Sequence, residues 1–266
     1  MRKLLSVLSI AALSLALLAG CSPKESGDNK IKIGVSPNPH SQLVSLVIED
    51  LKADGVEVEI VEFTDYVQPN LALESGDLDA NFFQHGPYFE DFIEKEDLDL
   101  VSLGNVHVEP MALYSDTFKS IDDLADGAQI GIPNDTVNGG RALLLLQSNG
   151  LITLKDGVGL EATENDIKDN PKNLKIVALE AAALPSTLQD LDGAVINGNY
   201  ALDAGLNPLK DGLIIEGGDS PYANLIAVRN GDETQDKFVK LLKALQSDKV
   251  REYIEETYEG GVAPAF

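Results

Sequence analysis

The chain of 266 residues contains one cysteine, Cys21, and no tryptophan. A single cysteine cannot form a disulfide within the chain, so the fold must be held together by its own apolar core. Hydrophobic residues make up 44% of the sequence, a share typical of packed globular proteins. The scarcity of cysteine therefore excludes a small disulfide-linked scaffold and favours one or two ordinary packed domains.

Motifs that carry chemistry are also scarce. The sequence has no Gly-x-Gly-x-x-Gly, no phosphate-binding loop, no Gly-x-Ser-x-Gly elbow and no His-Glu-x-x-His. Only three histidines occur, and His107 with Glu109 would place two metal ligands on one face of a strand. Because no third ligand is evident, we interpret that pair as exposed on its strand. We expect no catalytic residue, no metal and no cofactor.

Basic residues are few, with 20 Lys and Arg against 44 Asp and Glu, which gives a formal net charge of −24. Nucleic acids and anionic membrane surfaces bind basic patches, so neither is expected as a partner of this surface. The acidity fits a protein kept soluble outside the cell. It does not decide the charge of a ligand, because one buried arginine outweighs distant surface acids.

The long apolar run lies at the N-terminus, where Arg2 and Lys3 precede Leu4–Leu18 and the string Leu18-Ala19-Gly20-Cys21. This pattern predicts a signal peptide over residues 1–20, because the run is short for a membrane span and ends in small residues. The small polar residues 21–30 predict a flexible tether. An ordinary secreted protein with a free thiol at Cys21 is the alternative.

From residue 31 onward, strand and helix patterns alternate. Ile31–Val35 and Val56–Ile60 flank a helical pattern that ends at Gly55, which predicts a βαβ unit with parallel strands. The alternation predicts an α/β fold of open, mostly parallel sheets with helices on both faces. Further helices are expected from Ser120, over Gly139–Asn149, and over Pro185–Leu191.

The number of strands suits two such lobes better than one. The extended segments 106–114 and 220–229 are the best candidates for chain crossing between lobes. We therefore assign residues 31–112 and 222–266 to the first lobe and residues 113–221 to the second.

The string Asn81-Phe82-Phe83-Gln84-His85-Gly86-Pro87-Tyr88 ends a predicted strand and begins a helix. Ligands of open α/β sheets bind at the carboxyl ends of strands, so these aromatics are candidates for an apolar pocket with a polar corner. Alternate strand residues face opposite sides of a sheet. We expect one of Phe82 and Phe83 in the core and the other in the pocket.

A second candidate is the turn-rich segment 133–143, which leads into an apolar helix and contains Arg141. A helix start offers free N–H groups and partial positive charge, and the guanidinium fork fits a carboxylate with two hydrogen bonds. Without the spacing of a phosphate loop, we interpret this as a carboxylate site. The alternative is that Arg141 pairs with one of the many acidic side chains.

Two asparagines, Asn197 and Asn224, stand at the ends of predicted strands. Their amides could bind an ammonium or a carboxylate. Asparagine also favours such positions because it tolerates turns, so each amide alone is weak support for a site.

Several strings together resemble the methionine-binding lipoproteins of ABC importers. The resemblance runs from residue 31 to the C-terminus, and Leu-Ala-Gly-Cys resembles the lipobox of bacterial lipoproteins. The most specific strings are Gln84-His85-Gly86-Pro87-Tyr88, Ile132-Pro133-Asn134-Asp135, Gly140-Arg141-Ala142-Leu143, Asn170 to Ile176, Ala194-Val195-Ile196-Asn197 and Ser220-Pro221-Tyr222-Ala223-Asn224-Leu225.

The resemblance implies a two-lobe periplasmic-binding-protein fold of type II, with an amino acid held between the lobes. It implies that Arg141, with Asn138 nearby, binds the α-carboxylate, and that Asn197 and Asn224 hold the amino and carboxylate groups. The residues implied around the ligand side chain are Tyr66, Phe83, His85 and Tyr88.

The same resemblance implies a lipid anchor on Cys21, an extracytoplasmic location at the cell membrane, and delivery of methionine to an ABC permease with a cytoplasmic ATPase. Relatives differ in taking L-methionine, D-methionine or a methionine dipeptide, and all three ligands remain open. Two further readings are a peptidase that uses His85 and a surface lipoprotein that transports nothing.

Overall fold

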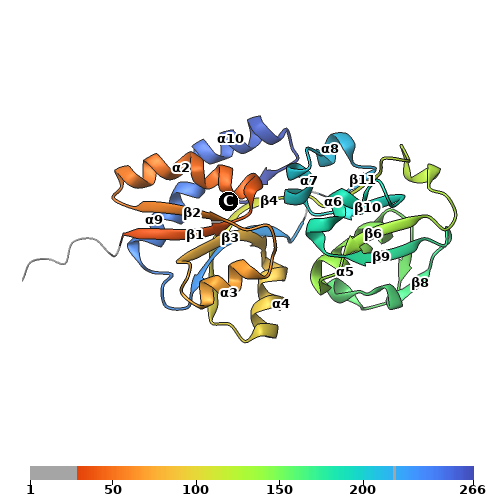
Figure 1. Ribbon diagram of the computed structural model, residues 1–266, viewed down its shortest axis with the longest axis horizontal. Helices are drawn as coiled ribbons and strands as arrows, with labels where there is room; N and C mark the ends of the chain where they lie inside the picture. The colour runs from red at the N-terminus through yellow and green to blue at the C-terminus, as the bar shows by residue number, and fades with distance from the viewer. Residues whose placement is uncertain (1–28, 218–219) are drawn as a thin grey trace, which may run out of the picture.

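The computed structural model describes residues 29–217 and 220–266. The predicted signal peptide, Cys21 and nearly all of the tether lie outside the described residues. Figure 1 shows two α/β lobes side by side, each built on its own sheet. In the described part of the chain, no helix has the length and apolarity that a membrane crossing requires.

The first lobe is built on a six-stranded sheet in the order β13-β4-β12-β3-β1-β2. The predicted βαβ unit is present, because β1 and β2 pair in parallel with Ile33 opposite Ile60. The strands of this sheet are β1 (Lys30–Val35), β2 (Glu57–Glu62), β3 (Ala80–His85), β4 (Leu100–Val108), β12 (Ala223–Arg229) and β13 (Ala263–Pro264).

Helices cover both faces of this sheet, as Figure 1 shows. One face buries the apolar stripes of α2 (Gln42–Ala53), α9 (Asp236–Leu245) and α10 (Asp248–Tyr258). The other face packs against α3 (Gln68–Glu74) and α4 (Gly86–Glu96). The alternation of strand residues sends Phe82 into the first of these cores.

The second lobe contains a five-stranded sheet in the order β11-β5-β10-β6-β9. Its strands are β5 (Ala112–Tyr114), β6 (Gln129–Pro133), β9 (Lys175–Leu179), β10 (Gly193–Ile196) and β11 (Ile214–Ile215). Helix α5 (Thr136–Ser148) covers one face. The short helices α6 (Leu184–Thr187) and α7 (Gly198–Asp203) lie on the other face. Helix α8 (Pro208–Asp211) lies beside β11. Strands β7 (Thr153–Leu154) and β8 (Ile167–Asp169) pair with each other and form a separate two-stranded sheet.

The two-lobe α/β fold predicted from the sequence is confirmed, but the prediction of mostly parallel sheets is wrong. In the first sheet β12 runs antiparallel to both β3 and β4, and in the second sheet β5 runs antiparallel to β10. The chain passes between sheets from β4 to β5 and again from β11 to β12, at or beside the predicted crossing segments. A strand that returns from the other lobe enters its sheet in the opposite direction, so both sheets are mixed.

Two predicted helices are shorter than expected. The segment after Ser120 forms only the single turn η2 (Ile121–Asp123), and the Ser120 side chain accepts no capping bond from the backbone. The helix expected over residues 185–191 is limited to α6. Both segments lack the apolar stripe along several turns that stabilises a longer helix.

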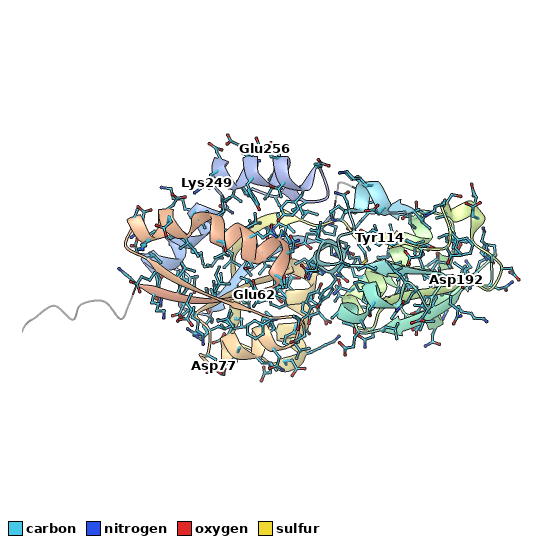
Figure 2. The ribbon with its side chains drawn as sticks, turned by 45° about the horizontal axis from the view of Figure 1, so that its top comes forward. Glu62, Asp77, Tyr114, Asp192, Lys249 and Glu256 are labelled. Carbon is cyan, nitrogen blue, oxygen red and sulfur yellow. The ribbon has the colours of Figure 1, made fainter. Side chains whose placement is uncertain are left out.

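Acidic side chains are spread over both lobes. Figure 2 shows Asp77 and Glu256 at the edges of the first lobe and Asp192 on the second. Acidic groups on both lobes agree with the interpretation that the negative net charge keeps the protein soluble.

Candidate functional site

A pocket lies between the two lobes, with about 320 Å³ of empty space that is partly open to solvent. The structure brings all eight residues implied by the resemblance into its wall. Four more residues that the sequence interpretation missed complete the lining. The twelve are Tyr66, Phe83, Gln84, His85, Tyr88, Glu109, Asn138, Arg141, Asn197, Gly198, Asn199 and Asn224.

One side of the pocket is aromatic. The ring centres of Tyr66, Phe83 and Tyr88 lie 5.7 to 6.4 Å from one another, at tilted or edge-to-face angles. Phe83 faces this pocket while its neighbour Phe82 is buried in the core, as the alternation of strand residues predicts. Tyr66 sits in a turn held by Asp65, whose side chain accepts from the backbone N–H groups of residues 67 and 68.

His85 joins strand β3 to helix α4 and faces the second lobe. Its Nδ1 accepts from the backbone N–H of Tyr88 at 3.2 Å, so it caps α4. This fixes the proton on Nε2, which donates to Asn138 Oδ1 at 3.0 Å. Burial and the nearby charge of Arg141 lower the pKa of His85 to about 3, so the ring is neutral at pH 7.

The second lobe contributes the first turns of α5. Asp135 caps this helix by accepting from the backbone N–H of Asn138 at 2.9 Å and from its side-chain amide at 3.0 Å. The oxygen of the Asn138 amide then faces the pocket and accepts from Asn197 Nδ2 at 2.8 Å as well as from His85. The cap therefore sets the direction of an amide that links both lobes.

Arg141 is buried in the wall, with 3% of its surface exposed. Its Nε and Nη2 donate to the two carboxylate oxygens of Glu216 at 2.8 and 2.5 Å, and Nη2 also donates to the main-chain oxygen of Glu109 at 3.0 Å. The Tyr222 ring lies 4.0 Å from the guanidinium carbon. The ion pair considered as the alternative is thus present, yet Nη1 has no hydrogen-bond partner within residues 29–217 and 220–266.

Two amide atoms in the pocket wall are buried without a partner among the described residues. They are Asn197 Oδ1, an acceptor, and Asn199 Nδ2, a donor. Buried polar groups are nearly always hydrogen-bonded in native proteins. An unpaired acceptor and an unpaired donor on one pocket therefore indicate a ligand that carries both kinds of polar group.

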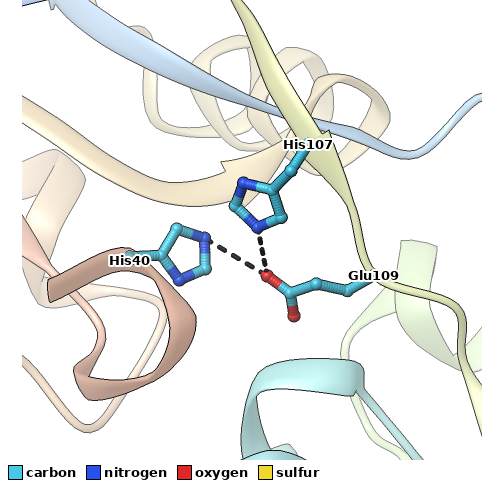
Figure 3. A group of neighbouring side chains, drawn as sticks. All are labelled: His40, His107 and Glu109. Carbon is cyan, nitrogen blue, oxygen red and sulfur yellow. Dashed lines mark hydrogen bonds and ion pairs between the residues drawn. The ribbon is translucent and has the colours of Figure 1, made fainter. Parts of the chain in front are cut away.

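The interpretation of His107 and Glu109 as an exposed pair is wrong. His107 is fully buried and Glu109 is 5% exposed, because η1 (Pro37–Ser41) packs against α7 over the end of strand β4. His40 of η1 joins them as the third side chain that the sequence did not reveal. Figure 3 shows both imidazoles directed at one carboxylate oxygen of Glu109.

The other residues that sequence reasoning missed are neighbours of predicted ones. Gln84 lies between Phe83 and His85, and Gly198 and Asn199 directly follow Asn197. These three residues lie at or just after the ends of β3 and β10, and that position at strand ends could have indicated that they belong to the pocket. Glu109 gave no such signal, since its burial depends on η1 and α7, which are distant in the sequence.

Several contacts join the lobes around the pocket. Tyr66 donates to Asn199 Oδ1 at 2.5 Å, and Tyr200 donates to the main-chain oxygen of Thr64 at 3.1 Å. At the rim, Lys95 Nζ in α4 donates to Thr136 Oγ1 in α5 at 2.9 Å. The lobes are therefore closed over the pocket in this structure.

Comparison with known proteins places these observations in a family. The chain is 48% identical over 256 residues to the D-methionine-binding lipoprotein MetQ of Salmonella typhimurium, covering 95% of this chain and 94% of that protein. It is 44% identical over 258 residues to the membrane lipoprotein TpN32 of Treponema pallidum, covering 97% and 95%.

Solved structures agree. A nutrient-binding protein from Burkholderia cenocepacia bound to methionine superposes with a TM-score of 0.86 at 48% identity, covering 89% of this chain and all of that one. The methionine-binding protein MetQ superposes with a TM-score of 0.87 at 46% identity, covering 90% and 99%. Both likenesses support the two-lobe binding-protein fold of type II.

The profile of the NlpA lipoproteins matches residues 31–266, which is the whole of the predicted folded region. Together with relatives of nearly equal length at well over 40% identity, this match is sufficient for assignment. The chain belongs to the NlpA lipoprotein family.

Proposed function

We propose that this protein is a lipid-anchored receptor that captures methionine between its two lobes and delivers it to an ABC import permease. One observation carries the proposal: the eight residues that the family resemblance implies as methionine ligands all line a single pocket between the lobes. Relatives named for D-methionine binding and a solved neighbour bound to methionine support the same ligand class.

The aromatic side of the pocket suits the methionine side chain. Tyr66, Phe83 and Tyr88 present ring edges and faces to a small apolar space. A thioether sulfur makes favourable contacts with aromatic edges.

The polar side suits a carboxylate. Arg141 Nη1, which has no hydrogen-bond partner among the described residues, provides charged N–H donors, and Asn199 Nδ2, likewise without a partner there, is a neutral donor. Burial of the methionine side chain, together with an ion pair between its carboxylate and Arg141, fits an affinity in the micromolar to nanomolar range, which is a binding free energy of roughly −8 to −12 kcal/mol.

Lobe closure supplies the mechanism of capture. A ligand that contacts β3 in one lobe and α5 in the other binds the closed state better than the open one, so it shifts the population toward closure. The closed receptor then presents both lobes to a permease, whose ATPase on the cytoplasmic side drives import. The anchor on Cys21 keeps the receptor at the extracytoplasmic face of the membrane, and the lipoprotein names of the relatives support this placement.

Calorimetry tests the proposal directly. The protein is unfolded and refolded to remove any ligand, then titrated with L-methionine, D-methionine, a methionine dipeptide and a panel of other amino acids. The proposal expects one site per chain that prefers methionine in one of these forms. Mass spectrometry of the recovered ligand should show it unchanged, whereas cleavage of the dipeptide would indicate a peptidase. Absence of binding by every form of methionine would reject the proposal.

A further inference from the structure

The carboxyl group of Glu109 is buried in the pocket wall. Its Oε1 lies 2.7 Å from His107 Nε2 and 3.4 Å from His40 Nε2. Its Oε2 lies against Gly198, where an added Cβ would come within 3.0 Å of that oxygen, and the nearby backbone N–H of Asn199 partly offsets the rise that burial causes in the pKa of Glu109. The group is therefore fixed in position by residues of both lobes.

The hydrogen bonds assign the protons of this cluster. His40 Nε2 faces two oxygens, Glu109 Oε1 and Asn224 Oδ1 at 3.1 Å, so it carries a proton, and Nδ1 accepts from Ser36 Oγ at 2.7 Å. His107 Nε2 contacts only the same carboxylate oxygen and donates to it. His107 thus donates to the carboxyl group of Glu109, whereas the hydrogen bond of His40 Nε2 goes to Asn224 and leaves Glu109 Oε1 at 3.4 Å. Burial lowers the pKa of both imidazoles, so they are neutral at pH 7, and burial also raises the pKa of Glu109.

No lysine or arginine among the described residues forms an ion pair with this carboxylate. The nearest guanidinium, that of Arg141, donates to the main-chain oxygen of Glu109 and pairs instead with Glu216. A buried charge without a counter-charge is costly, and burial accordingly raises the pKa of Glu109. A ligand cation that reaches the carboxylate offsets that cost and favours its ionised form.

A metal ion does not fit this geometry. Ligand atoms at about 2.0–2.2 Å from a tetrahedral ion are about 3.3 Å apart, whereas His107 Nε2 and Glu109 Oε1 are at the distance of a direct hydrogen bond. A metal-bound histidine also needs a partner for the proton on its other nitrogen. His107 Nδ1 is buried and has no such partner within the described ranges.

An ammonium group fits better. It carries three N–H donors, and the pocket offers the Glu109 carboxylate and the unpaired acceptor Asn197 Oδ1. The Arg141 guanidinium touches the main chain of the same Glu109, so a positive and a negative subsite lie side by side. That pairing matches the two charged groups on the α-carbon of a free amino acid.

We propose that Glu109, positioned by His40 and His107, binds the ligand ammonium, and that the pocket therefore selects methionine with a free α-ammonium over N-acylated methionine. This inference rests on the proposed methionine receptor function and names its substrate class. His40 and His107 act as positioning residues, since they contact the carboxylate rather than line the pocket.

Calorimetry with refolded protein and matched ligands tests the inference without any variant. Methionine should bind at least 100-fold more tightly than N-acetylmethionine and 4-(methylthio)butanoate, which lack the ammonium. Equal affinity for methionine and 4-(methylthio)butanoate would overturn the inference. If no form of methionine binds, the proposed function fails first, and the inference fails with it.

Variants then assign the effect to Glu109. Glu109→Gln keeps the shape but removes the charge, and should weaken methionine binding at least 30-fold while leaving 4-(methylthio)butanoate within threefold. Glu256→Gln, on the exposed face of α10, is the matched control and should change neither. Methionine affinity within twofold of wild type in a folded Glu109→Gln protein would overturn the assignment.

The positioning role has its own test. His107→Gln can place an amide N–H where Nε2 donates, so it should retain most methionine affinity, whereas His107→Leu should lose it selectively relative to 4-(methylthio)butanoate. An equal loss for both ligands would overturn the positioning role.

Titration with zinc chloride alone tests the metal alternative. No zinc site that depends on His107 should appear. A one-to-one zinc site that is lost in His107→Leu would replace the ammonium assignment with a metal one.

Discussion

Arg141 is restrained on three sides by groups from distant parts of the chain. Glu216 holds two of its nitrogens, the main-chain oxygen of Glu109 accepts from one of them, and the Tyr222 ring packs against its plane. A guanidinium held in this way loses little conformational entropy when it meets a ligand carboxylate. The Glu216 pair therefore orients the guanidinium, and Nη1 has no hydrogen-bond partner among the described residues.

Removal of this clamp should weaken binding strongly. Arg141→Ala is expected to cost about 2–5 kcal/mol of methionine affinity, because a buried carboxylate loses its charged partner. Arg251→Ala, which removes an arginine of α10 that bonds the main-chain oxygen of Phe266, is the matched control and should leave affinity unchanged. Calorimetry measures both, and equal affinity in the two variants would reject Arg141 as the clamp.

His85 should make folding stability depend on pH. Its pKa of about 3 in the folded protein lies below the ordinary value of 6.5, so between these values the unfolded chain binds a proton that the folded chain does not. Stability is therefore lost as pH falls through this range, by about 2 kcal/mol at pH 5 for this one group.

Urea unfolding at pH 7 and pH 5 measures the His85 effect. The wild-type protein should lose more unfolding free energy over this interval than His85→Gln, which has no ring to protonate. Identical losses in the two proteins would contradict a neutral, buried His85.

At the scale of elements, helix α5 depends on two glycines in its first turns. A Cβ at Gly140 would lie 2.0 Å from the main-chain oxygen of Leu160, and one at Gly139 would lie 2.9 Å from that of Pro133. The turn η3 (Gly159–Glu161) therefore packs directly against the backbone of the helix. This close approach positions Asn138 and Arg141 on the side of the pocket.

Gly140→Ala should displace that turn or the helix start. Since the contact is with backbone, which cannot rotate away, we expect a loss of about 1–3 kcal/mol in unfolding free energy and weaker methionine binding. Gly86→Ala at the start of α4 meets no atom within 4 Å and is the matched control. Denaturant melts compare them, and equal stability would show that the α5 contact is not tight.

The elements were predictable where a local pattern sufficed. The apolar spacing of Leu43, Val44, Val47 and Leu51 predicted α2. Helix α5 was predicted to begin at Gly139 and begins at Thr136, because the cap at Asp135 was not recognised. The antiparallel pairing of β12 was not predictable, since it depends on the path between lobes. The burial of Glu109 was missed for the same reason, because its cover comes from η1 and α7.

At the scale of the whole molecule, the site belongs to neither lobe alone. The aromatic wall comes mainly from β3 and α4, while Asn138 and Arg141 come from α5. Tyr66 to Asn199 and Tyr200 to Thr64 are direct bonds between the lobes beside the pocket. Closure thus assembles the site, and a ligand that bridges both walls stabilises the closed form.

The anchor should determine where the molecule works. Cys21→Ala is expected to release the protein from the membrane fraction, because the sulfur proposed to carry the lipid is gone and the chain has a strongly negative net charge. Ser22→Ala is the control and should stay with the membranes. Fractionation followed by immunoblotting measures both, and membrane retention of Cys21→Ala would contradict lipid anchoring.

The most direct test of the central claim is a crystal structure of refolded protein grown with an excess of methionine. We expect the amino acid between the lobes, with its sulfur among the rings of Tyr66, Phe83 and Tyr88 and its carboxylate at Arg141 Nη1. An empty pocket, or methionine bound elsewhere while Arg141 keeps only Glu216, would contradict the account.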